Sequence, residues 1–425
     1  MIKFGDGRDW FFEKRFGLFL HWGLYAIEGF HEQDQWRRKI SRETYMKLGD
    51  QWDPRDFDPH QWLDAAEDAG MEYLVLTTKH HEGFCLWDTK ETAFNTMNTP
   101  YGQDIVKLYV DACHERNFPV GLYYSVVDWN HANYPNEGRH HELEGPEPGD
   151  EPDLEKYMSF LRRQVSELCS NYGEIHEFWW DMNVAEYSDP SINELIRKLQ
   201  PKCVINNRGM DEGDFGTPER GWNEDKDSLV HSKPVEACNS VGAQSWGYRK
   251  DESYYTDQYL LSNIDKFLAK GGNYLLNVGP GPNGRIAKES TSILKRIGVW
   301  MNKMRESLYD VEAVSFMTVN RNVLLTKRDH TLYVHLNIHP EEEDVVLKPF
   351  TDLPLSATLL NDGSRVRFSN DMIPAQHRGQ KGYLRLQGLP VNKYSNDVLV
   401  IKLEFKYLET NEVAEESTGF DIHTL

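Results

Sequence analysis

Short apolar runs alternate with amphipathic helical patterns through the first 300 residues, and this alternation constrains the fold more than any other feature. The apolar runs that predict strands are 17–24, 72–81, 119–129, 174–182, 202–209, 235–240 and 273–280. The patterns that predict helices between them are 58–70, 104–117, 153–173, 191–200 and 257–272. Parallel strands are usually joined by helices, so the order predicts βα units around a parallel sheet. The strand number is close to the eight of a (β/α)8-like barrel. A doubly wound open sheet is the alternative, but no glycine-rich phosphate loop follows the first run.

The pattern changes after a helix predicted over residues 289–308. The segments that follow are short, often alternate between apolar and polar residues, and are separated by turn residues: 331–338, 343–350, 356–362, 382–388 and 397–405. Such segments without intervening helices are typical of an antiparallel β-sandwich. We therefore expect an α/β barrel domain over residues 1–308 and a C-terminal β-sandwich over residues 309–425.

The charge balance excludes several classes of partner. The chain has 47 basic and 68 acidic residues, a formal net charge of −21, which repels nucleic acid and anionic lipid surfaces. No run of 18 apolar residues is present, and charged residues occupy the N-terminus where a signal peptide needs an apolar stretch. We therefore expect no nucleic-acid partner, no membrane association and a cytoplasmic location. The five cysteines are dispersed without metal-binding spacing and are expected to be small buried side chains.

Active sites of barrels of this class lie at the C-terminal ends of the strands. The predicted strands end on His21 and Trp22; His80 and His81; Tyr123, Tyr124, Asp128 and Trp129; Trp179, Trp180 and Asp181; Asn207 and Arg208; Glu236; and Asn277. Aromatic rings pack against the C–H faces of sugars, while carboxylates and imidazoles pair with hydroxyl groups. This set of residues indicates a neutral, polyhydroxylated ligand.

Asp181 is the most informative of these positions. It closes the run EFWWD, where large apolar rings make a charge costly unless a donor such as Arg208 compensates. A carboxylate held ionised there serves as a nucleophile or stabilises developing positive charge. The alternative is a capping aspartate at the start of the next loop.

Glycoside hydrolysis needs a second carboxyl group that protonates the departing oxygen. Four candidates follow Asp181 in the chain: Glu219 in the segment DFGTPERGW, Glu224, Asp225 and Glu236 in VEACNS. Each of them alone is equally compatible with an ordinary acidic residue, since the chain has 68 of these.

The adjacent histidines His80 and His81 raise the alternative of a metal site completed by His21 and Asp181. Neighbouring residues of one strand point to opposite faces, so at most one of the two histidines faces the pocket unless the strand breaks. We therefore expect no metal and interpret the imidazoles as hydrogen-bonding partners for hydroxyl groups.

Taken together, these motifs resemble those of a known enzyme family. FGLFLHWGLYAI, TTKHHEGFCLWDT, GLYYSVVDW, FWWD, INNRG, TPE, EACNS with SWGY, and GGNYLLNVGPGPNGRI occur in the order and spacing of the family 29 glycoside hydrolases, the α-L-fucosidases. The resemblance covers about residues 9–305. It implies an imperfect (β/α)8-like barrel followed by a β-sandwich, and a retaining double-displacement hydrolysis of terminal α-L-fucose without a cofactor.

The resemblance also implies roles for single residues. Asp181 matches the nucleophile of the family, and Trp246 matches the aromatic side chain that packs against the methyl group of the sugar. The residues matching those that hold the hydroxyl groups or brace the nucleophile are His21, His80, His81, Tyr123 and Arg208. Glu219 resembles the acid/base best by its spacing, and Glu236 is the second choice. Trp22, Trp36, Trp179, Trp180 and Trp246 are expected to line or brace the sugar pocket.

One position departs from the family pattern. The family often has Glu-Trp where this chain has Gln35-Trp36, so an amide takes the place of a carboxylate that accepts a sugar hydroxyl. We expect Gln35 and Trp36 to bind substrate with altered specificity, with Asp34 or Glu32 as substitutes for the carboxylate.

The expected partner is a fucosylated glycan, and a homo-oligomer is left open. The two alternatives are a metal-dependent barrel hydrolase and a non-catalytic fucose-binding protein. The C-terminal sandwich carries no tryptophan, so a structural role is favoured over a lectin site.

Overall fold

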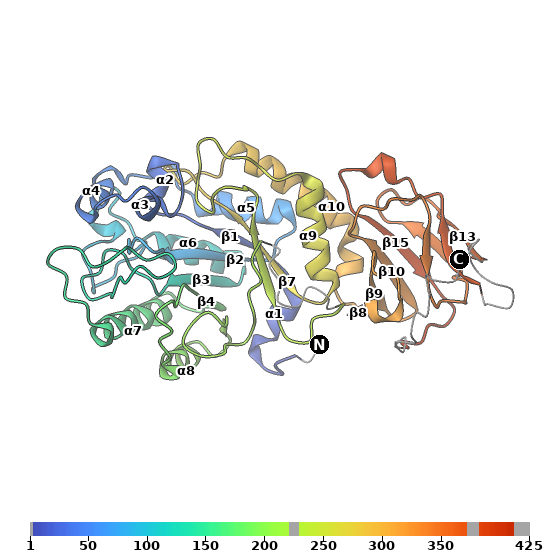
Figure 1. The fold of residues 1–425 in the computed structure, drawn as a ribbon, viewed down its shortest axis with the longest axis horizontal. Coiled ribbons are helices and arrows are strands. Elements are labelled where there is room, and N and C mark those ends of the chain that lie inside the picture. The colour runs from blue at the N-terminus through green and yellow to red at the C-terminus, as the bar shows by residue number, and fades with distance from the viewer. Residues whose placement is uncertain (1–2, 221–228, 372–381, 412–425) are drawn as a thin grey trace, which may run out of the picture. The chain divides into compact units, whose positions relative to one another are not determined.

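The computed structural model describes residues 3–220, 229–371 and 382–411, whose helices and strands are shown in Figure 1. The described residues form two compact units. The first unit consists of the described residues within 1–224, 233–255 and 273–299. The second unit consists of the described residues within 225–232, 256–272 and 300–425. The units interleave along the chain, and the boundary expected between residues 308 and 309 stays a prediction.

The first unit is built on a seven-stranded sheet in the order β5-β4-β3-β2-β1-β7-β6. Every neighbouring pair is parallel. The strands are β1 (Phe16–Leu20), β2 (Tyr73–Lys79), β3 (Val120–Ser125), β4 (Glu177–Asp181), β5 (Val204–Ile205), β6 (Glu236–Ser240) and β7 (Asn273–Val278). Each overlaps one of the predicted strands, and the barrel-like α/β class is confirmed.

An extended segment, residues 215–219, lies between the two edge strands of this sheet. The backbone N–H of Asn207, just after β5, donates to Phe215 O at 2.9 Å. On the other side, Glu236 N donates to Gly216 O at 2.9 Å and Cys238 N donates to Pro218 O at 2.8 Å. The segment therefore bridges β5 and β6 and continues the parallel pairing around the barrel, so its last residues lie beside β6.

The helices that follow the strands were also predicted from the sequence. They are α5 (Pro59–Ala69), α6 (Ile105–Glu115), α7 (Leu154–Asn171), α8 (Pro190–Leu199), α9 (Asp257–Ala269) and α10 (Lys288–Leu308). Helix α5 shows the local reason: the Asp58 side chain accepts the His60 N–H, Pro59 takes the first turn, and Gly70 ends the helix at φ +78°. Four short helices were not predicted, because four or five residues are too few to show a helical period: α1 (Trp10–Glu13), α2 (Tyr25–Glu28), α3 (Asp34–Arg37) and α4 (Arg42–Met46).

Side chains of alternate strand residues fill the interior of the barrel. In β4, Trp179 belongs to the interior cluster, together with Phe19, Tyr73 and Tyr123 of neighbouring strands. Successive strand residues point to opposite faces. Trp180 accordingly lies on the other face, where its Nε1 donates to Asn193 Oδ1 at 2.9 Å. The side chains of β4 that point into the barrel are therefore Trp179 and the residues an even number of positions away from it.

The second unit contains two antiparallel sheets, which confirms the predicted sandwich. One has the order β12-β15-β10-β9-β8 and the other β11-β14-β13. Their strands are β8 (Glu312–Ala313), β9 (Leu324–Arg328), β10 (Thr331–Leu336), β11 (Val345–Leu347), β12 (Ser356–Leu359), β13 (Arg367–Asp371), β14 (Tyr383–Gln387) and β15 (Leu399–Glu404). Leucine and valine side chains of both sheets form one core, including Leu332, Leu347, Leu384 and Leu403.

A buried ion pair joins α9 to β10 within the second unit. His335 Nδ1 lies 2.7 Å from Asp265 Oδ1, and His335 Nε2 lies 2.9 Å from Thr326 Oγ1. Both members of the pair are 0% exposed. Removing one partner leaves the other buried group without its counterpart, so Asp265→Ala is expected to lower the free energy of unfolding by about 3 kcal/mol. Urea denaturation measures this, with the exposed Asp352→Ala as control; a loss no larger than the control's would contradict it.

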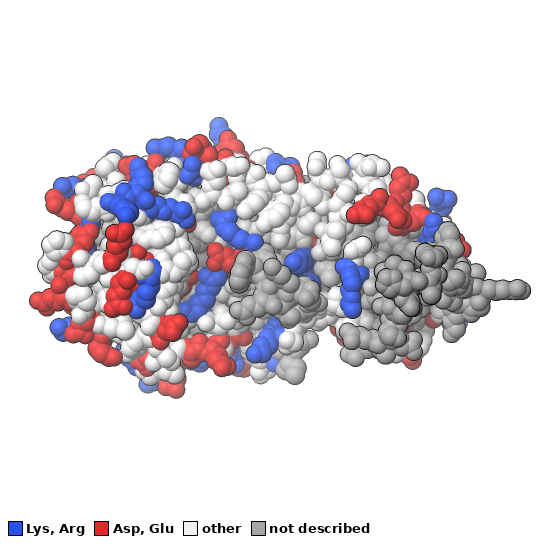
Figure 2. Space-filling model, in the orientation of Figure 1, with Lys and Arg blue, Asp and Glu red and all other residues white. Residues whose placement is uncertain are grey.

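Acidic and basic side chains are interspersed on the face drawn in Figure 2, and its described Lys and Arg residues form no continuous basic stripe. None of the described helices is both long and apolar enough to cross a membrane. The five cysteines are buried and free of disulfide bonds, as predicted.

Candidate active site

A cavity of about 120 Å³ lies in the first unit, where the C-terminal ends of the strands meet. Its lining includes many of the residues that the sequence singled out: His21, His80, His81, Tyr123, Asp181, Arg208, Glu219 and Trp246. It also includes Phe19, Glu32, Gln33, His140, His141, Trp179, Met182 and Cys238.

Asp181 ends β4 with its carboxylate held by two donors. Tyr123 Oη donates to Asp181 Oδ2 at 2.7 Å, and Arg208 Nη1 donates to Asp181 Oδ1 at 3.0 Å. The side chain is 13% exposed, so these donors act in a largely water-free surrounding and fix the direction of both carboxylate oxygens. Asp181 is therefore an oriented carboxylate that lines the pocket, not a helix or loop cap.

Arg208 connects Asp181 to Glu219. Its Nη2 donates to Glu219 Oε2 at 3.0 Å, while its Nε donates to Thr217 Oγ1 at 2.6 Å. Glu219 is 39% exposed, and its backbone is fixed by the pairing of residues 215–219 with β6. One guanidinium group thus brings the two carboxylates together, although they lie on segments that are separate in the sequence.

The structure places Glu236, the second candidate for the acid/base, beneath the pocket. Tyr73 Oη donates to Glu236 Oε1 at 2.5 Å, and Trp179 Nε1 donates to Glu236 Oε2 at 3.1 Å. The residue is 0% exposed, because β6 directs this side chain into the barrel interior. Burial raises the pKa of Glu236 to about 7, and burial together with the charge of Glu236 raises the pKa of neighbouring Glu177. Glu236 therefore supports the Trp179 ring from below and does not line the cavity.

Two buried histidines present acceptor nitrogens to the pocket. The Asn277 amide donates to Trp246 O at 2.7 Å, so its Oδ1 faces His21 Nδ1, 2.7 Å away, and accepts that proton. Ser125 Oγ donates to Val127 O, so it accepts the proton of His81 Nδ1, 2.7 Å away. The Nε2 atom of each neutral ring is left as an acceptor. Burial and the neighbouring His80 lower the pKa of His21 to about 3, which keeps it neutral.

Both His80 and His81 line the cavity, which the alternation of side chains allows only where the strand breaks. The reason is that β2 ends at Lys79, after a shift in its register with β3 between Thr77 and Lys79. The two imidazoles follow the strand in a turn and stack with ring centroids 3.9 Å apart.

The structure places Gln35 and Trp36 outside the pocket and Glu32 inside it. Helix α3 turns Gln35 toward Asn130, with which it exchanges amide hydrogen bonds of 3.2 and 3.3 Å. Trp36 Nε1 donates to Glu142 O at 2.6 Å. Burial acts to raise the pKa of Glu32, but the nearby His31 and a hydrogen bond from Ser245 outweigh it and lower the pKa. Glu32, one of the two substitutes expected for the carboxylate, therefore presents an ionised group at the cavity.

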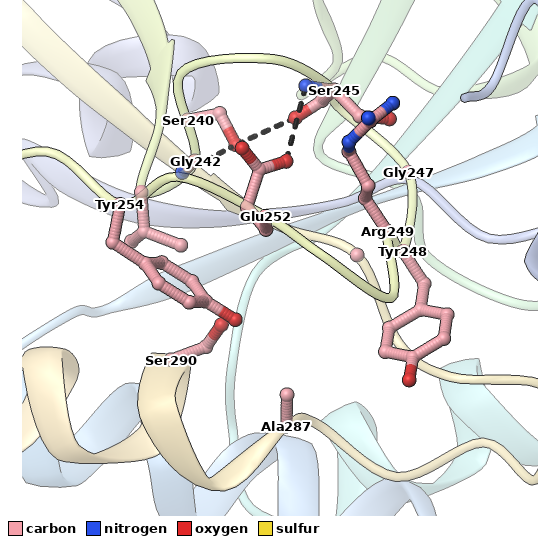
Figure 3. Close-up of a pocket in the computed structure, with 12 residues that line it drawn as sticks. Ser240, Gly242, Ser245, Gly247, Tyr248, Arg249, Glu252, Tyr254, Ala287 and Ser290 are labelled. Carbon is pink, nitrogen blue, oxygen red and sulfur yellow. Dashed lines mark hydrogen bonds between the residues drawn. The ribbon is translucent and has the colours of Figure 1, made fainter. Parts of the chain in front are cut away.

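Two carboxylates fix the loop 241–255 around Trp246. Glu32 Oε2 accepts the Trp246 N–H at 2.9 Å and the Ser245 hydroxyl at 2.7 Å. Within the loop, the Glu252 carboxylate accepts the N–H groups of Gln244 and Ser245 at 3.0 and 3.2 Å, and it lines the smaller cavity of Figure 3. The backbone that carries the Trp246 indole is therefore held by both carboxylates.

Among the tryptophans expected near the sugar, only Trp179 and Trp246 line the cavity in the described chain. Trp22 packs instead against Trp52 and Trp62, at 4.9 and 5.3 Å between ring centroids, and Trp180 faces α8.

Within the described residues, no group of three or more His, Cys, Asp and Glu side chains is arranged to hold a metal ion. The imidazole Nδ1 atoms of His21 and His81 are already used by Asn277 and Ser125. Of the remaining acid/base candidates, Glu224 and Asp225 lie outside the described residues.

Glu82 is buried beside His80, and its raised pKa makes the stability of the protein depend on pH. It is 1% exposed, its Oε2 lies 3.4 Å from His80 Nδ1, and burial raises its pKa to about 8. The pKa of a glutamate in an unfolded chain is about 4.3. Between these values the folded state holds a proton that the unfolded state has released, so Glu82 lowers stability as the pH rises, by up to about 1.4 kcal/mol per pH unit.

Glu82→Gln stays neutral, so its stability relative to the wild type is expected to increase from pH 5 to pH 8 and to level off above that. Urea denaturation at several pH values measures the difference. The same substitution at the exposed Glu194 is the control. A constant difference for Glu82→Gln would show that the carboxyl group is ionised throughout.

Comparisons with known proteins agree with this geometry. Residues 5–306 match the family model described as alpha-L-fucosidase. The chain belongs to the α-L-fucosidase family. A tissue alpha-L-fucosidase from Homo sapiens is 25% identical over 395 residues, which cover 85% of this chain and 82% of that protein. An alpha-L-fucosidase from Dictyostelium discoideum is 28% identical over 393 residues, covering 83% and 82%.

Solved structures of the family have the same fold. Alpha-L-fucosidase isoenzyme 1 from Paenibacillus thiaminolyticus is 32% identical, with a TM-score of 0.81 over 94% of this chain and 98% of that chain. A family 29 α-L-fucosidase from Bacteroides thetaiotaomicron, trapped as a covalent intermediate with 2-fluoro-fucosyl fluoride, is 26% identical. Its TM-score is 0.78, over 95% of this chain and 97% of that chain.

Among the pocket residues with a polar side chain, three were not found by sequence reasoning: Gln33, His140 and His141. His140 and His141 are the second pair of adjacent histidines in the chain, in the long connection between β3 and α7. Because barrel sites are built from the connections after the strands, this pair was a usable signal. Gln33 carries no such signal.

Proposed function

We propose that this chain is an exo-acting, retaining α-L-fucosidase that removes terminal α-L-fucose from fucosylated oligosaccharides or glycoconjugates. The observation that carries the proposal is the pair of carboxylates, Asp181 and Glu219, held by Arg208 at one pocket. The family membership and the trapped covalent intermediate of the Bacteroides thetaiotaomicron relative support it.

In this proposal Asp181 attacks the anomeric carbon while Glu219 protonates the departing oxygen. The exposure of the two side chains fits these roles, since Asp181 is 13% exposed at the bottom and Glu219 is 39% exposed toward the leaving group. Glu219 then removes a proton from a water molecule, which cleaves the fucosyl-enzyme ester and releases fucose with its original configuration. Tyr123 and Arg208 hold the carboxylate of Asp181 in line for the attack.

The remaining pocket groups bind the sugar. The Nε2 atoms of His21 and His81 accept hydroxyl protons, Glu32 takes the carboxylate role first assigned to position 35, and Trp246 packs against the methyl group. A cytoplasmic location and a homo-oligomer stay predictions from the sequence.

The test is hydrolysis of an aryl α-L-fucoside followed by proton NMR. We expect α-fucose as the first product and no change on addition of EDTA. Release of β-fucose would contradict the retaining mechanism, and loss of activity with EDTA would favour the metal-dependent hydrolase. Fucose binding without hydrolysis would favour the non-catalytic alternative.

A further inference from the structure

Three side chains at the cavity lie beyond the strand ends that define the sugar site. Gln33 precedes α3, and His140 and His141 lie in the connection between β3 and α7. His140 is exposed and His141 is half-buried, whereas the strand-end histidines of the same cavity are almost fully buried. His140 and His141 therefore lie at the mouth of the pocket, and the buried Gln33 contacts His141 there.

The imidazole rings form a series that leads from the floor of the pocket to this mouth. The ring centroids of His21 and His80 are 5.7 Å apart, and those of His80 and His81 are 3.9 Å apart. His141 follows His81 at 6.1 Å, and His140 stacks on His141 at 3.9 Å with an interplanar angle of 24°. A sugar bound at the floor reaches the buried histidines, and a group that it carries out of the pocket on this side passes His141 and His140.

The mouth is a built structure with fixed backbone. Trp129 Nε1 donates to His141 O at 2.7 Å, and Trp36 Nε1 donates to Glu142 O at 2.6 Å. The Glu142 carboxylate is buried and accepts from Tyr134 Oη at 2.6 Å and from Arg139 Nη2 at 2.9 Å. These contacts fix the backbone that carries the two imidazoles, which lowers the entropy cost of binding a ligand there.

His141 and Gln33 present an uncharged ring and an amide at the mouth. Burial and the neighbouring His140 lower the pKa of His141 to about 4, so its ring is uncharged near neutral pH. Arg37 Nε donates to Gln33 Oε1 at 3.0 Å, and Gln33 Nε2 lies 3.3 Å from His141 Nδ1. The amide is thereby oriented, with donor capacity remaining for a ligand. A flat neutral ring beside an oriented amide suits a pyranose, whose C–H face packs on a ring while its hydroxyls pair at the edge.

We propose that His140, His141 and Gln33 form the binding site for the leaving group, and that this group is a neutral pyranoside. The inference rests on the proposed α-L-fucosidase activity and names the class of aglycone that the enzyme takes. His140 and His141 determine specificity and take no part in bond cleavage.

The test compares two kinds of substrate. In α-L-fucosyl fluoride the leaving group is a single atom that does not reach the mouth, whereas α1,2-, α1,3-, α1,4- and α1,6-linked fucosyl disaccharides place a sugar there. We expect His141→Ala and His140→Ala each to lower kcat/KM about 5- to 10-fold for the best disaccharide, mainly through KM. The fluoride should change less than about twofold, which also shows that the variants are folded. His141→Gln should recover part of the loss, and the exposed His60→Ala is the control.

An equal loss with both kinds of substrate would overturn the inference, because it would place the rings at the fucose itself. Unchanged kinetics with every disaccharide would overturn it as well. Failure of the wild-type protein to hydrolyse the fluoride would instead refute the proposed function, since that reaction does not involve the mouth.

Discussion

Asp181→Ala is expected to lower kcat by about 10⁴-fold or more, for activated and natural substrates alike. The carboxylate of Asp181 is the group placed to form the covalent bond, with Tyr123 and Arg208 holding its two oxygens. Its removal leaves a space beside donors that are still in position. Added azide should enter this space, attack the anomeric carbon and restore part of the turnover, giving β-L-fucosyl azide by a single inversion.

The measurement is fluoride release from α-L-fucosyl fluoride with and without azide, followed by NMR of the product. Glu194→Ala, an exposed acid on α8, should keep full activity. Asp181→Ala with a tenth or more of wild-type activity would contradict the assignment, as would a rescued product of α configuration.

Glu219→Gln is expected to have an effect that depends on the leaving group. Sugars leave poorly unless protonated, so kcat/KM for a fucosyl disaccharide should fall about 10²- to 10⁴-fold. Fluoride and nitrophenolate leave readily, so kcat/KM for their fucosides should change far less. The second step still needs a base, and the fucosyl-enzyme should therefore accumulate and appear as a burst of released leaving group. Azide needs no base, and should restore turnover with α-L-fucosyl azide as product.

Glu236→Gln is the matched comparison, because it replaces the carboxyl group of the other acid/base candidate with an amide. Glu236 contacts Trp179 and Tyr73 beneath the cavity, so any loss should be similar for good and poor leaving groups. If kcat/KM fell selectively for the disaccharides in Glu236→Gln and not in Glu219→Gln, Glu236 and not Glu219 would be the acid/base.

Much of the barrel could be predicted because its signals are local. The run EFWWD predicts a strand, and the alternation of its side chains predicts that Trp179 and Asp181 share the interior face. The caps of α5 are likewise contained in the sequence, from Asp58 to Gly70. The strand ends therefore indicated seven of the sixteen residues that line the cavity.

The choice between Glu219 and Glu236 could not be made in this way. Both follow Asp181 in plausible segments, and only the bridging of β5 and β6 by residues 215–219 brings Glu219 to Arg208. The break of β2 at Lys79, which lets His80 and His81 share the cavity, depends on register with a neighbouring strand.

The sequence by itself determined the two fold classes and the place of Asp181 at the C-terminal end of a strand. It also indicated that the site binds a carbohydrate. These depend on periodicity and on residue types within short segments. Only the tertiary structure decided that Glu32 and not Gln35 enters the pocket, and that His140 and His141 form its mouth. The physical reason is that a short helix such as α3 and a long connection have no period of their own, so their side chains are directed by contacts with distant segments such as those of Trp36 and Trp129.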